Sequence, residues 1–279
     1  MVFIDAHNHI QDPRVARSLE DIFATYESHG VVFSALNATH PDDWATVASL
    51  AKRYSFLVPN FGVHPWFIKD LPSNWKDTLR SLVTDIPSGI GEVGIDGWHK
   101  EFDTKKQEEI FLAQLAMAAE LNLPISIHGL RRWSRLLELL QNNPLPTCGF
   151  LLHSYGGPEE MIPSFAKLGG YFSCPGFFLS PDREMKLRVF SAVPEGRLLL
   201  ETDSPDQNLP EALDLYRLAS AVDGKRINHP GNIVAIYEGV AQLRGISVES
   251  LSTMVEANFR RLFSPVLSKK SPTSQAALT

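Results

Sequence analysis

The chain has 279 residues, of which 44% are hydrophobic, and its formal net charge is -6 at pH 7. This length allows one large α/β barrel or two medium-sized domains. The net negative charge argues against a general binder of polyanions, although a local basic patch could still hold a phosphate-bearing ligand.

Short, β-rich apolar runs alternate along the chain with longer helix-like stretches, which is typical of a parallel sheet covered by helices. Most of the runs are apolar throughout rather than alternating, as expected for strands that are buried on both faces. The strands predicted from these runs span residues 2–5, 31–37, 56–62, 90–93, 125–128, 150–153, 170–173 and 198–201.

Helix signals occur between and after these runs. Thr104 and Gln107 form a candidate capping box before an apolar stripe that begins at Phe111. A similar stripe occupies residues 251–262, and Ser250 is its candidate N-cap. Both stretches are therefore predicted to be amphipathic helices.

About eight strand–helix units in this length favour a (β/α)8 TIM-like barrel, regular or distorted, over an open doubly wound sheet. A doubly wound sheet would more often carry a Gly-rich phosphate loop after its first strand, and Gly91-x-x-Gly94-x-x-Gly97 is not that fingerprint. We predict one barrel domain of residues 1–264. Residues 265–279 lack a convincing apolar stripe and are predicted to form a flexible tail.

The two cysteines, Cys148 and Cys174, do not form a Cys-x-x-Cys pair, which argues against a disulfide framework or a structural zinc ribbon. The N-terminus opens directly into a predicted strand without signal-peptide features. No apolar run approaches the roughly 20 residues that a membrane helix needs. We therefore expect a soluble, cytoplasmic protein that does not enter a membrane.

Six residues of types that bind divalent cations stand at or just after the ends of predicted strands. They are His7, His9, Glu92, His128, His153 and Asp203. Alone, each has an ordinary alternative as a core histidine, a paired buried acid or a helix cap. Packing would prefer apolar or small residues at five strand ends, so the joint pattern predicts a metal site at the barrel mouth.

The first of these residues form a His-x-His pair. In a regular strand, residues i and i+2 face the same way, so His7 and His9 can reach one cation. Asp5 shares this face, and we expect it to orient an imidazole or to contact the cation.

These residues belong to motifs that occur in a fixed order from residue 3 to about residue 263. The motifs are Asp5-Ala6-His7-Asn8-His9, Gly62-Val63-His64-Pro65, Gly91-Glu92-Val93-Gly94-Ile95-Asp96, His128, His153-Ser154-Tyr155-Gly156-Gly157, Glu201-Thr202-Asp203-Ser204-Pro205, Asn228-His229-Pro230 and Asn258-Phe259. With this set the sequence resembles the TatD family of metal-dependent hydrolases, within the amidohydrolase-like barrels. The resemblance covers nearly the whole chain.

The resemblance implies a site for two divalent cations. One cation would be held by His7, His9 and Asp203, the other by His128 and His153, and both by a bridging Glu92. Two adjacent cations can activate a water and stabilise the attacking and leaving oxygens, and Asp203 would take the proton of that water. Activity in the family is usually tied to Mg, whereas four imidazoles suit Zn, Mn, Ni or Fe better as bound ions.

Family members are usually described as deoxyribonucleases that often trim DNA from the 3′ end. The resemblance therefore implies a phosphodiesterase whose substrate is DNA, either single-stranded or at 3′ ends. The candidate substrate contacts are His64, Arg131, Tyr155 and Trp66, with Trp98 as a further stacking surface and Arg132, Lys225 and Arg226 as further cations. Core packing of the aromatic residues and simple solvation of the charged ones remain the alternatives.

Three departures from the family pattern concern the predicted substrate pocket. Leu130 occupies the usual arginine position, Trp66 stands where many relatives have a second histidine, and Gly97-Trp98 replaces a common aromatic pair. Two other functions stay open. One is hydrolysis of a small amide or ester by the same chemistry. The other is a non-catalytic, metal-stabilised role in association with DNA-processing proteins, and no feature predicts an oligomeric state.

Overall fold

The computed structural model describes residues 1–98, 101 and 103–270. Eight strands form one sheet in the order β1 to β8, and each strand pairs in parallel with its neighbours in the chain. The strands are β1 (Phe3–Asn8), β2 (Val31–Asn37), β3 (Leu57–Phe61), β4 (Gly89–Asp96), β5 (Ile125–Leu130), β6 (Phe150–Leu152), β7 (Gly170–Pro175) and β8 (Leu198–Glu201). All eight predicted strands are confirmed, as is the single TIM-like barrel.

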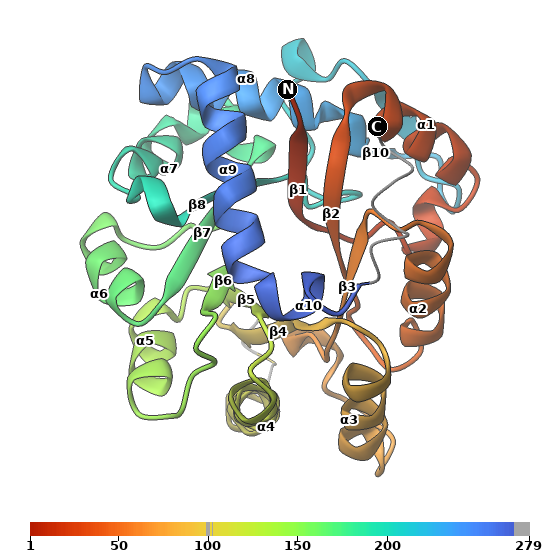
Figure 1. Cartoon of the computed structure of the whole chain (residues 1–279), viewed down its shortest axis with the longest axis vertical. Coiled ribbons are helices and arrows are strands. Elements are labelled where there is room, and N and C mark those ends of the chain that lie inside the picture. The colour runs from red at the N-terminus through yellow and green to blue at the C-terminus, as the bar shows by residue number, and fades with distance from the viewer. Residues whose placement is uncertain (99–100, 102, 271–279) are drawn as a thin grey trace.

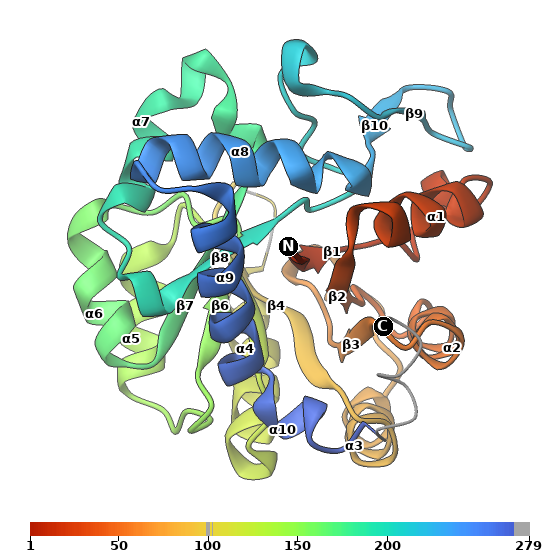
Figure 2. The ribbon, with the colours of Figure 1, turned by 45° about the horizontal axis from the view of Figure 1, so that its top comes forward.

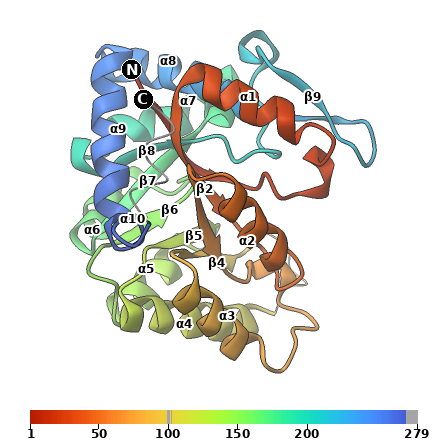
Figure 3. The same cartoon turned by 45° about the vertical axis from the view of Figure 1, so that its right-hand side comes forward.

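Helices surround the sheet, as Figure 1 shows. They are α1 (Leu19–His29), α2 (Trp44–Arg53), α3 (Trp75–Asp85), α4 (Thr104–Leu121), α5 (Trp133–Gln141), α6 (Ile162–Lys167), α7 (Glu184–Arg188), α8 (Ile233–Arg244), α9 (Val248–Leu262) and α10 (Ser264–Leu267). Between β8 and α8 the chain adds an antiparallel hairpin of β9 (Arg217–Ala219) and β10 (Arg226–Asn228). This hairpin projects beyond the barrel near α1 (Figures 2 and 3).

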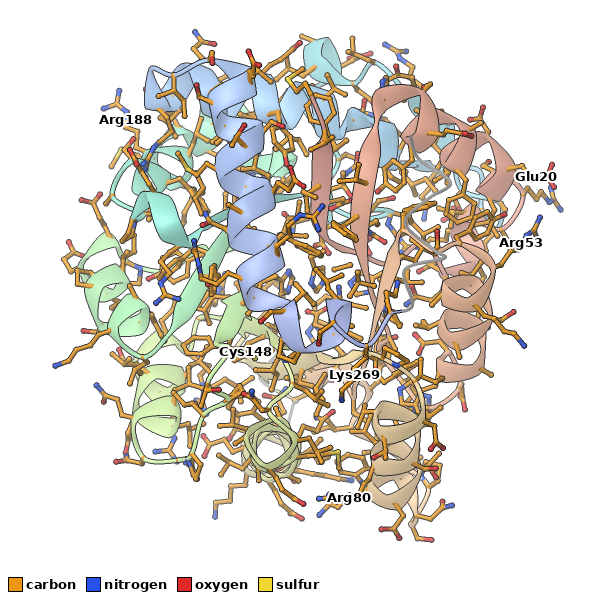
Figure 4. All side chains as sticks on the ribbon, in the orientation of Figure 1. Glu20, Arg53, Arg80, Cys148, Arg188 and Lys269 are labelled. Carbon is orange, nitrogen blue, oxygen red and sulfur yellow. The ribbon has the colours of Figure 1, made fainter. Side chains whose placement is uncertain are left out.

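Apolar side chains fill the space between the sheet and the helices, whereas charged side chains such as Arg53, Arg80 and Arg188 point outward (Figure 4). The predicted stripes on α4 and α9 are buried. Both predicted caps are wrong, because the capping side chain lies earlier in each case. Asp103 accepts the N–H of Lys106 at the start of α4, and Ser247 accepts that of Ser250 at the start of α9.

β1 and β8 lie side by side and close the barrel. Near the carboxyl ends the backbones bond directly: His9 N donates to Ser204 O at 2.7 Å, and Asp203 N donates to His7 O at 3.0 Å. The helices α8 and α9 pack against this seam between the first and last strands. Barrel closure therefore brings the His-x-His pair next to Asp203, although about 195 residues separate them in the chain.

Farther along the seam, a side chain bridges the backbone. The buried hydroxyl of Tyr237 on α8 accepts the N–H of Ile4 at 3.0 Å and donates to the carbonyl of Ile4 at 3.2 Å. Buried backbone groups need such partners, since an unpaired one costs about 1–3 kcal/mol. Tyr237 thus supplies hydrogen bonds to the first strand at the point of closure.

Replacing Tyr237 with Phe should lower the free energy of unfolding by about 2 kcal/mol, because the ring stays while the two Ile4 groups lose their partner. Urea unfolding followed by circular dichroism measures the change. Tyr54→Phe is the control, since the Tyr54 hydroxyl bonds to none of the described residues, and it should change stability by less than about 0.5 kcal/mol. Equal effects of the two substitutions would contradict this role.

The start of the predicted tail packs on the barrel. Val266 in α10 is fully buried, and Lys270 Nζ donates to Ser55 O and Leu57 O. The boundary predicted at residue 264 therefore moves to at least residue 270, and the rest of that prediction, residues 271–279, lies outside the described residues. Within the part of the chain that is described, no helix combines the length and apolarity needed to cross a membrane.

Candidate metal centre

Histidines on or just after β1, β5 and β6 surround the buried carboxylate of Glu92 on β4, and its two oxygens face different histidines. Glu92 Oε2 lies 3.3 Å from His7 Nε2 and 3.0 Å from His9 Nε2. Glu92 Oε1 lies 3.0 Å from His128 Nδ1 and 2.7 Å from His153 Nε2. One carboxylate therefore stands between two pairs of imidazoles.

The sixth predicted ligand, Asp203, completes the cluster from the end of β8. Its Oδ1 lies 3.6 Å from His7 Nε2 and 3.5 Å from His9 Nε2. The ring of His7 also stacks on that of His153, with 3.9 Å between centroids. Candidate ligand atoms of His7, His153 and Asp203 all lie within 4.8 Å of one another, so the structure brings all six predicted ligands to one place.

Fixed acceptors orient two of the imidazoles. His9 Nδ1 lies 2.7 Å from the carbonyl of Asn37, and His128 Nε2 lies 2.8 Å from Asp96 Oδ2. A carbonyl or carboxylate oxygen only accepts, so the ring hydrogen of each neutral imidazole lies there. The other ring nitrogen then presents its lone pair toward Glu92, which is the orientation that a metal ligand needs.

The other two imidazoles have polar neighbours at the same outer position. His7 Nδ1 lies 2.9 Å from Ser126 Oγ, and His153 Nδ1 lies 3.6 Å from Glu201 Oε1. Asp96 and Glu201 belong to the sequence motifs, but neither residue was predicted to have a role. A signal was present for both, since each stands an even number of positions from a predicted ligand, Asp96 four positions after Glu92 and Glu201 two positions before Asp203.

His64 differs from these four histidines. Its Nδ1 accepts the backbone N–H of Trp66 at 3.2 Å, so the neutral ring carries its hydrogen on Nε2. That nitrogen lies 3.2 Å from Glu92 Oε1. Although His64, Glu92 and His128 are close enough to hold an ion, His64 presents a donor rather than a lone pair. This geometry suits a contact with a substrate oxygen better than ligation.

Burial and close charges shift the pKa values in the cluster. Burial raises the pKa of Glu92, but the charges of His153 and His64 and hydrogen bonds with His128 outweigh it and hold that pKa well below its ordinary value. Burial, with repulsion from His153, lowers the pKa of His7 to about 3. Burial also lowers the pKa of His153, but the negative charges of Glu92 and Glu201 outweigh it, so the net shift is upward.

The donor set fits divalent cations. Four imidazoles and two carboxylates converge, and oxygen and nitrogen atoms about 3 Å apart can share an ion at the usual bond lengths of about 2.0–2.2 Å. Protons on these histidines would compete with a cation for the same nitrogens, so cation affinity should fall as the pH falls. The residues present therefore match the predicted metal chemistry, whichever ion they hold.

Asp5 does not contact the imidazole rings, so its predicted role is wrong. Its carboxylate accepts the hydroxyl of Tyr26 at 2.6 Å and the backbone N–H of Thr202 at 2.9 Å. Its only contact with His7 is a backbone N–H at 3.4 Å. The register of β1 shifts between Asp5 and Asn8, so the regular alternation of faces that underlay the prediction does not hold there.

Tyr155 is also wrongly predicted, because it belongs to the core and has no exposed surface on which a base could stack. Its ring packs against those of Trp133 and Phe172, with centroids 4.7 and 5.0 Å away. Its hydroxyl donates to Pro158 O at 2.7 Å. Tyr155 therefore shapes the turn after β6 and is not a substrate contact.

The other predicted substrate residues retain exposed surface near the cluster. Trp66 is 46% exposed, and its Nε1 donates to Asp96 Oδ2 at 2.7 Å, so it contacts the acid that orients His128. Trp98 is 50% exposed, and the Arg131 guanidinium lies 3.9 Å from the centroid of its ring. Trp66, Trp98 and Arg131 stay predicted substrate contacts.

The three further cations are engaged with acids. Arg226 binds the buried Asp214 at 2.7 Å, which gives it a structural role at the hairpin and corrects its prediction as a substrate contact. Lys225 lies 3.0 Å from Asp223, and the Nη2 of Arg132 lies 3.7 Å from Glu108. For these two the prediction stays open.

Comparison with known proteins gives matches along almost the whole chain. The family described as TatD related DNase matches residues 4–264. The human protein named deoxyribonuclease TATDN3 is 28% identical over 276 residues, covering 93% of this chain and 94% of the relative. The 3'-5' ssDNA/RNA exonuclease TatD of Salmonella typhimurium (strain LT2) is 31% identical over 256 residues, covering 90% and 95%. The crystal structure of the TatD homologue YjjV from Escherichia coli K12 superposes with a TM-score of 0.84 at 24% identity, covering 94% and 98% of the two chains.

Proposed function

Because the chain belongs to the TatD related DNase family and is a metal-dependent hydrolase, we propose that it removes nucleotides from the 3′ end of single-stranded DNA. The observation that carries this proposal is the position of Glu92, whose Oε2 faces His7 and His9 while its Oε1 faces His128 and His153. A carboxylate so placed could contribute to binding two cations, and two-metal sites are one arrangement that nucleases use.

Two cations held there would activate a water and offset the negative charge that the transition state gathers. Asp203 would accept the proton of that water, a role supported by its Oδ1, which faces the nitrogens of His7 and His9. His64 would donate its Nε2 hydrogen to a phosphate oxygen. The charges of Glu92 and Asp203 balance part of the charge that the cations bring into a buried site.

The exposed residues beside the centre suit a flexible single strand. The indoles of Trp66 and Trp98 offer faces on which unpaired bases can stack, and such stacking contributes about 1–3 kcal/mol for each base. Arg131 would pair with a backbone phosphate while lying on Trp98. A duplex keeps its bases inside the stack, so these contacts favour single-stranded ends.

The test uses a single-stranded DNA oligonucleotide labelled at its 5′ end, with Mg or Mn as the added ion. We expect a ladder that shortens one nucleotide at a time from the 3′ end, no shortening in EDTA, and protection when the 3′ terminus is blocked. Internal cuts would contradict the polarity. An intact oligonucleotide with Mg, Mn, Zn and Ni alike, together with turnover of a small ester or amide, would overturn the phosphodiesterase proposal.

A further inference from the structure

Gln207 makes a pair of short contacts at the metal centre that the proposed chemistry does not yet use. It lies in the segment after β8, partly buried, and its amide Nε2 lies 2.6 Å from both Asp203 Oδ2 and Ser154 Oγ. Its backbone φ of 51° is in the left-handed region, which residues other than Gly, Asn and Asp seldom adopt. The fold therefore holds this side chain against Asp203 in an uncommon backbone conformation.

The hydrogens available for donation determine the orientation of the Gln207 amide. Ser154 has one hydroxyl hydrogen and donates it to Glu201 Oε1, so its oxygen must accept from Gln207. The Asp203 carboxylate also needs a donor, and only the amide nitrogen has two hydrogens to give. In this orientation Gln207 Oε1 is buried and bonds to none of the described residues. The side chain thus keeps both donor contacts and leaves its acceptor unpaired.

The two oxygens of the Asp203 carboxylate have different partners. Oδ2 receives the amide hydrogen, whereas Oδ1 faces His7 Nε2 at 3.6 Å and His9 Nε2 at 3.5 Å. Among the described residues, Gln207 makes the one hydrogen bond to Oδ2. Without it the carboxylate could rotate about its last side-chain bond, and Oδ1 would no longer be held toward the cation site.

The second amide hydrogen links Asp203 to the opposite side of the cluster. Ser154 follows β6 and donates to Glu201, whose Oε1 lies 3.6 Å from His153 Nδ1. Gln207 therefore connects Asp203, the ligand that follows β8, with the environment of His153, the ligand that follows β6. A carboxylate could not replace the amide here, because Asp203 and Glu201 are themselves acceptors and need donors between them.

We propose that Gln207 is a positioning residue of the metal centre. It holds Asp203 Oδ2, and thereby fixes Oδ1 for binding a cation and for accepting the proton of the attacking water. The second part rests on the proposed function, whereas the effect on cation binding does not. Substitution of residues that orient metal ligands usually lowers metal affinity or activity about 10- to 100-fold.

The experiment compares wild type with Gln207→Met, which keeps the length of the side chain and removes both donors. We expect Mn affinity, measured by titration calorimetry, to fall about 10-fold, and kcat on single-stranded DNA to fall at least as much while KM changes less than about threefold. Gln242→Met, the same substitution at an exposed position on α8, is the control and should leave both quantities unchanged. Thermal unfolding in EDTA checks that each variant is folded.

A double-mutant cycle separates positioning from general structure. In an Asp203→Asn background, Gln207→Met should change Mn affinity less than about twofold, because the group on which it acts is already altered. Equal Mn affinity of wild type and Gln207→Met, an undiminished effect in that background, or no Mn binding by wild type overturns the proposal. If wild type leaves all DNA substrates uncut while Gln207→Met still weakens Mn binding, the positioning role stands and the proposed function fails.

Discussion

Glu92→Gln should lower the rate of DNA cleavage about 1,000-fold, the largest loss of activity that we expect from one substitution. Glutamine keeps the size of the side chain but removes the negative charge. It also places an NH2 group against one of the two histidine pairs, where Glu92 now offers an acceptor to each. The site between the two pairs of imidazoles would therefore hold cations less well, and several kcal/mol of transition-state stabilisation would be lost.

Cation binding should be lost in the same variant. In wild type the Glu92 carboxylate contacts four predicted ligands, so its neutralisation weakens both halves of the site together. We expect calorimetry to show fewer Mn ions bound per chain in Glu92→Gln than in wild type. A variant that bound the same number of ions with the same affinity would contradict the bridging position of Glu92, even if its activity were low.

The matched control is Glu120→Gln. Glu120 is exposed on α4 and is paired with Arg80 at 2.7 Å. The same substitution there removes a charge that contacts none of the predicted metal ligands. An exposed ion pair is screened by water and contributes little. Activity and Mn binding should therefore match wild type, and a parallel loss in both variants would point to a general charge effect.

The architecture was predictable because each strand is an apolar run long enough to be buried on both faces. Residues such as Leu198, Leu199 and Leu200 leave few alternatives to an interior strand. The six ligands were predictable for a related reason. Polar residues at the ends of such runs conflict with packing, so their recurrence carries information about function rather than stability.

The predictions that failed, and the residue that was missed, depend on contacts between distant segments. The register shift in β1 turns Asp5 away from the imidazoles, and nothing in the local sequence marks it. Tyr155 stands beside a ligand in its motif, yet Trp133 and Phe172 enclose its ring. Gln207 meets Ser154, 53 residues earlier in the chain, only because β6 and β8 end at the same face of the barrel. Alternation and spacing describe one segment at a time and cannot predict which side chains of distant segments contact each other.

Asp5→Ala should lower the free energy of unfolding by about 4 kcal/mol, the largest stability effect that we expect. Asp5 is fully buried at the seam between β1 and β8, where its carboxylate accepts from Thr202 N, Thr202 Oγ1, Tyr26 OH and Asn8 Nδ2. Alanine would leave these donors buried without their acceptor. Their combined cost exceeds that of a single lost hydrogen bond, since each unpaired group costs about 1–3 kcal/mol.

Burial raises the pKa of Asp5 to about 6, although hydrogen bonds from Thr202 and Tyr26 oppose this. Unfolding in urea should therefore be measured at pH 8, where the carboxylate is charged in both the folded and the unfolded chain. Tyr26→Phe removes a single donor and should cost about 1–2 kcal/mol. In the Asp5→Ala background the same Tyr26→Phe change should cost less, because the hydroxyl then has no acceptor to lose.

Asp5→Asn keeps the shape of the side chain and gives a folded protein for the second measurement, should Asp5→Ala fail to fold. Asp5 touches no imidazole ring, so Mn affinity of the folded Asp5→Asn protein should stay within about threefold of wild type, well short of the 10- to 100-fold loss typical of residues that orient metal ligands. A loss of affinity as large as that expected for Gln207→Met would show that Asp5 acts on the metal centre after all. Unchanged stability of both Asp5 variants would instead show that Asp5 does not stabilise the closure of the barrel.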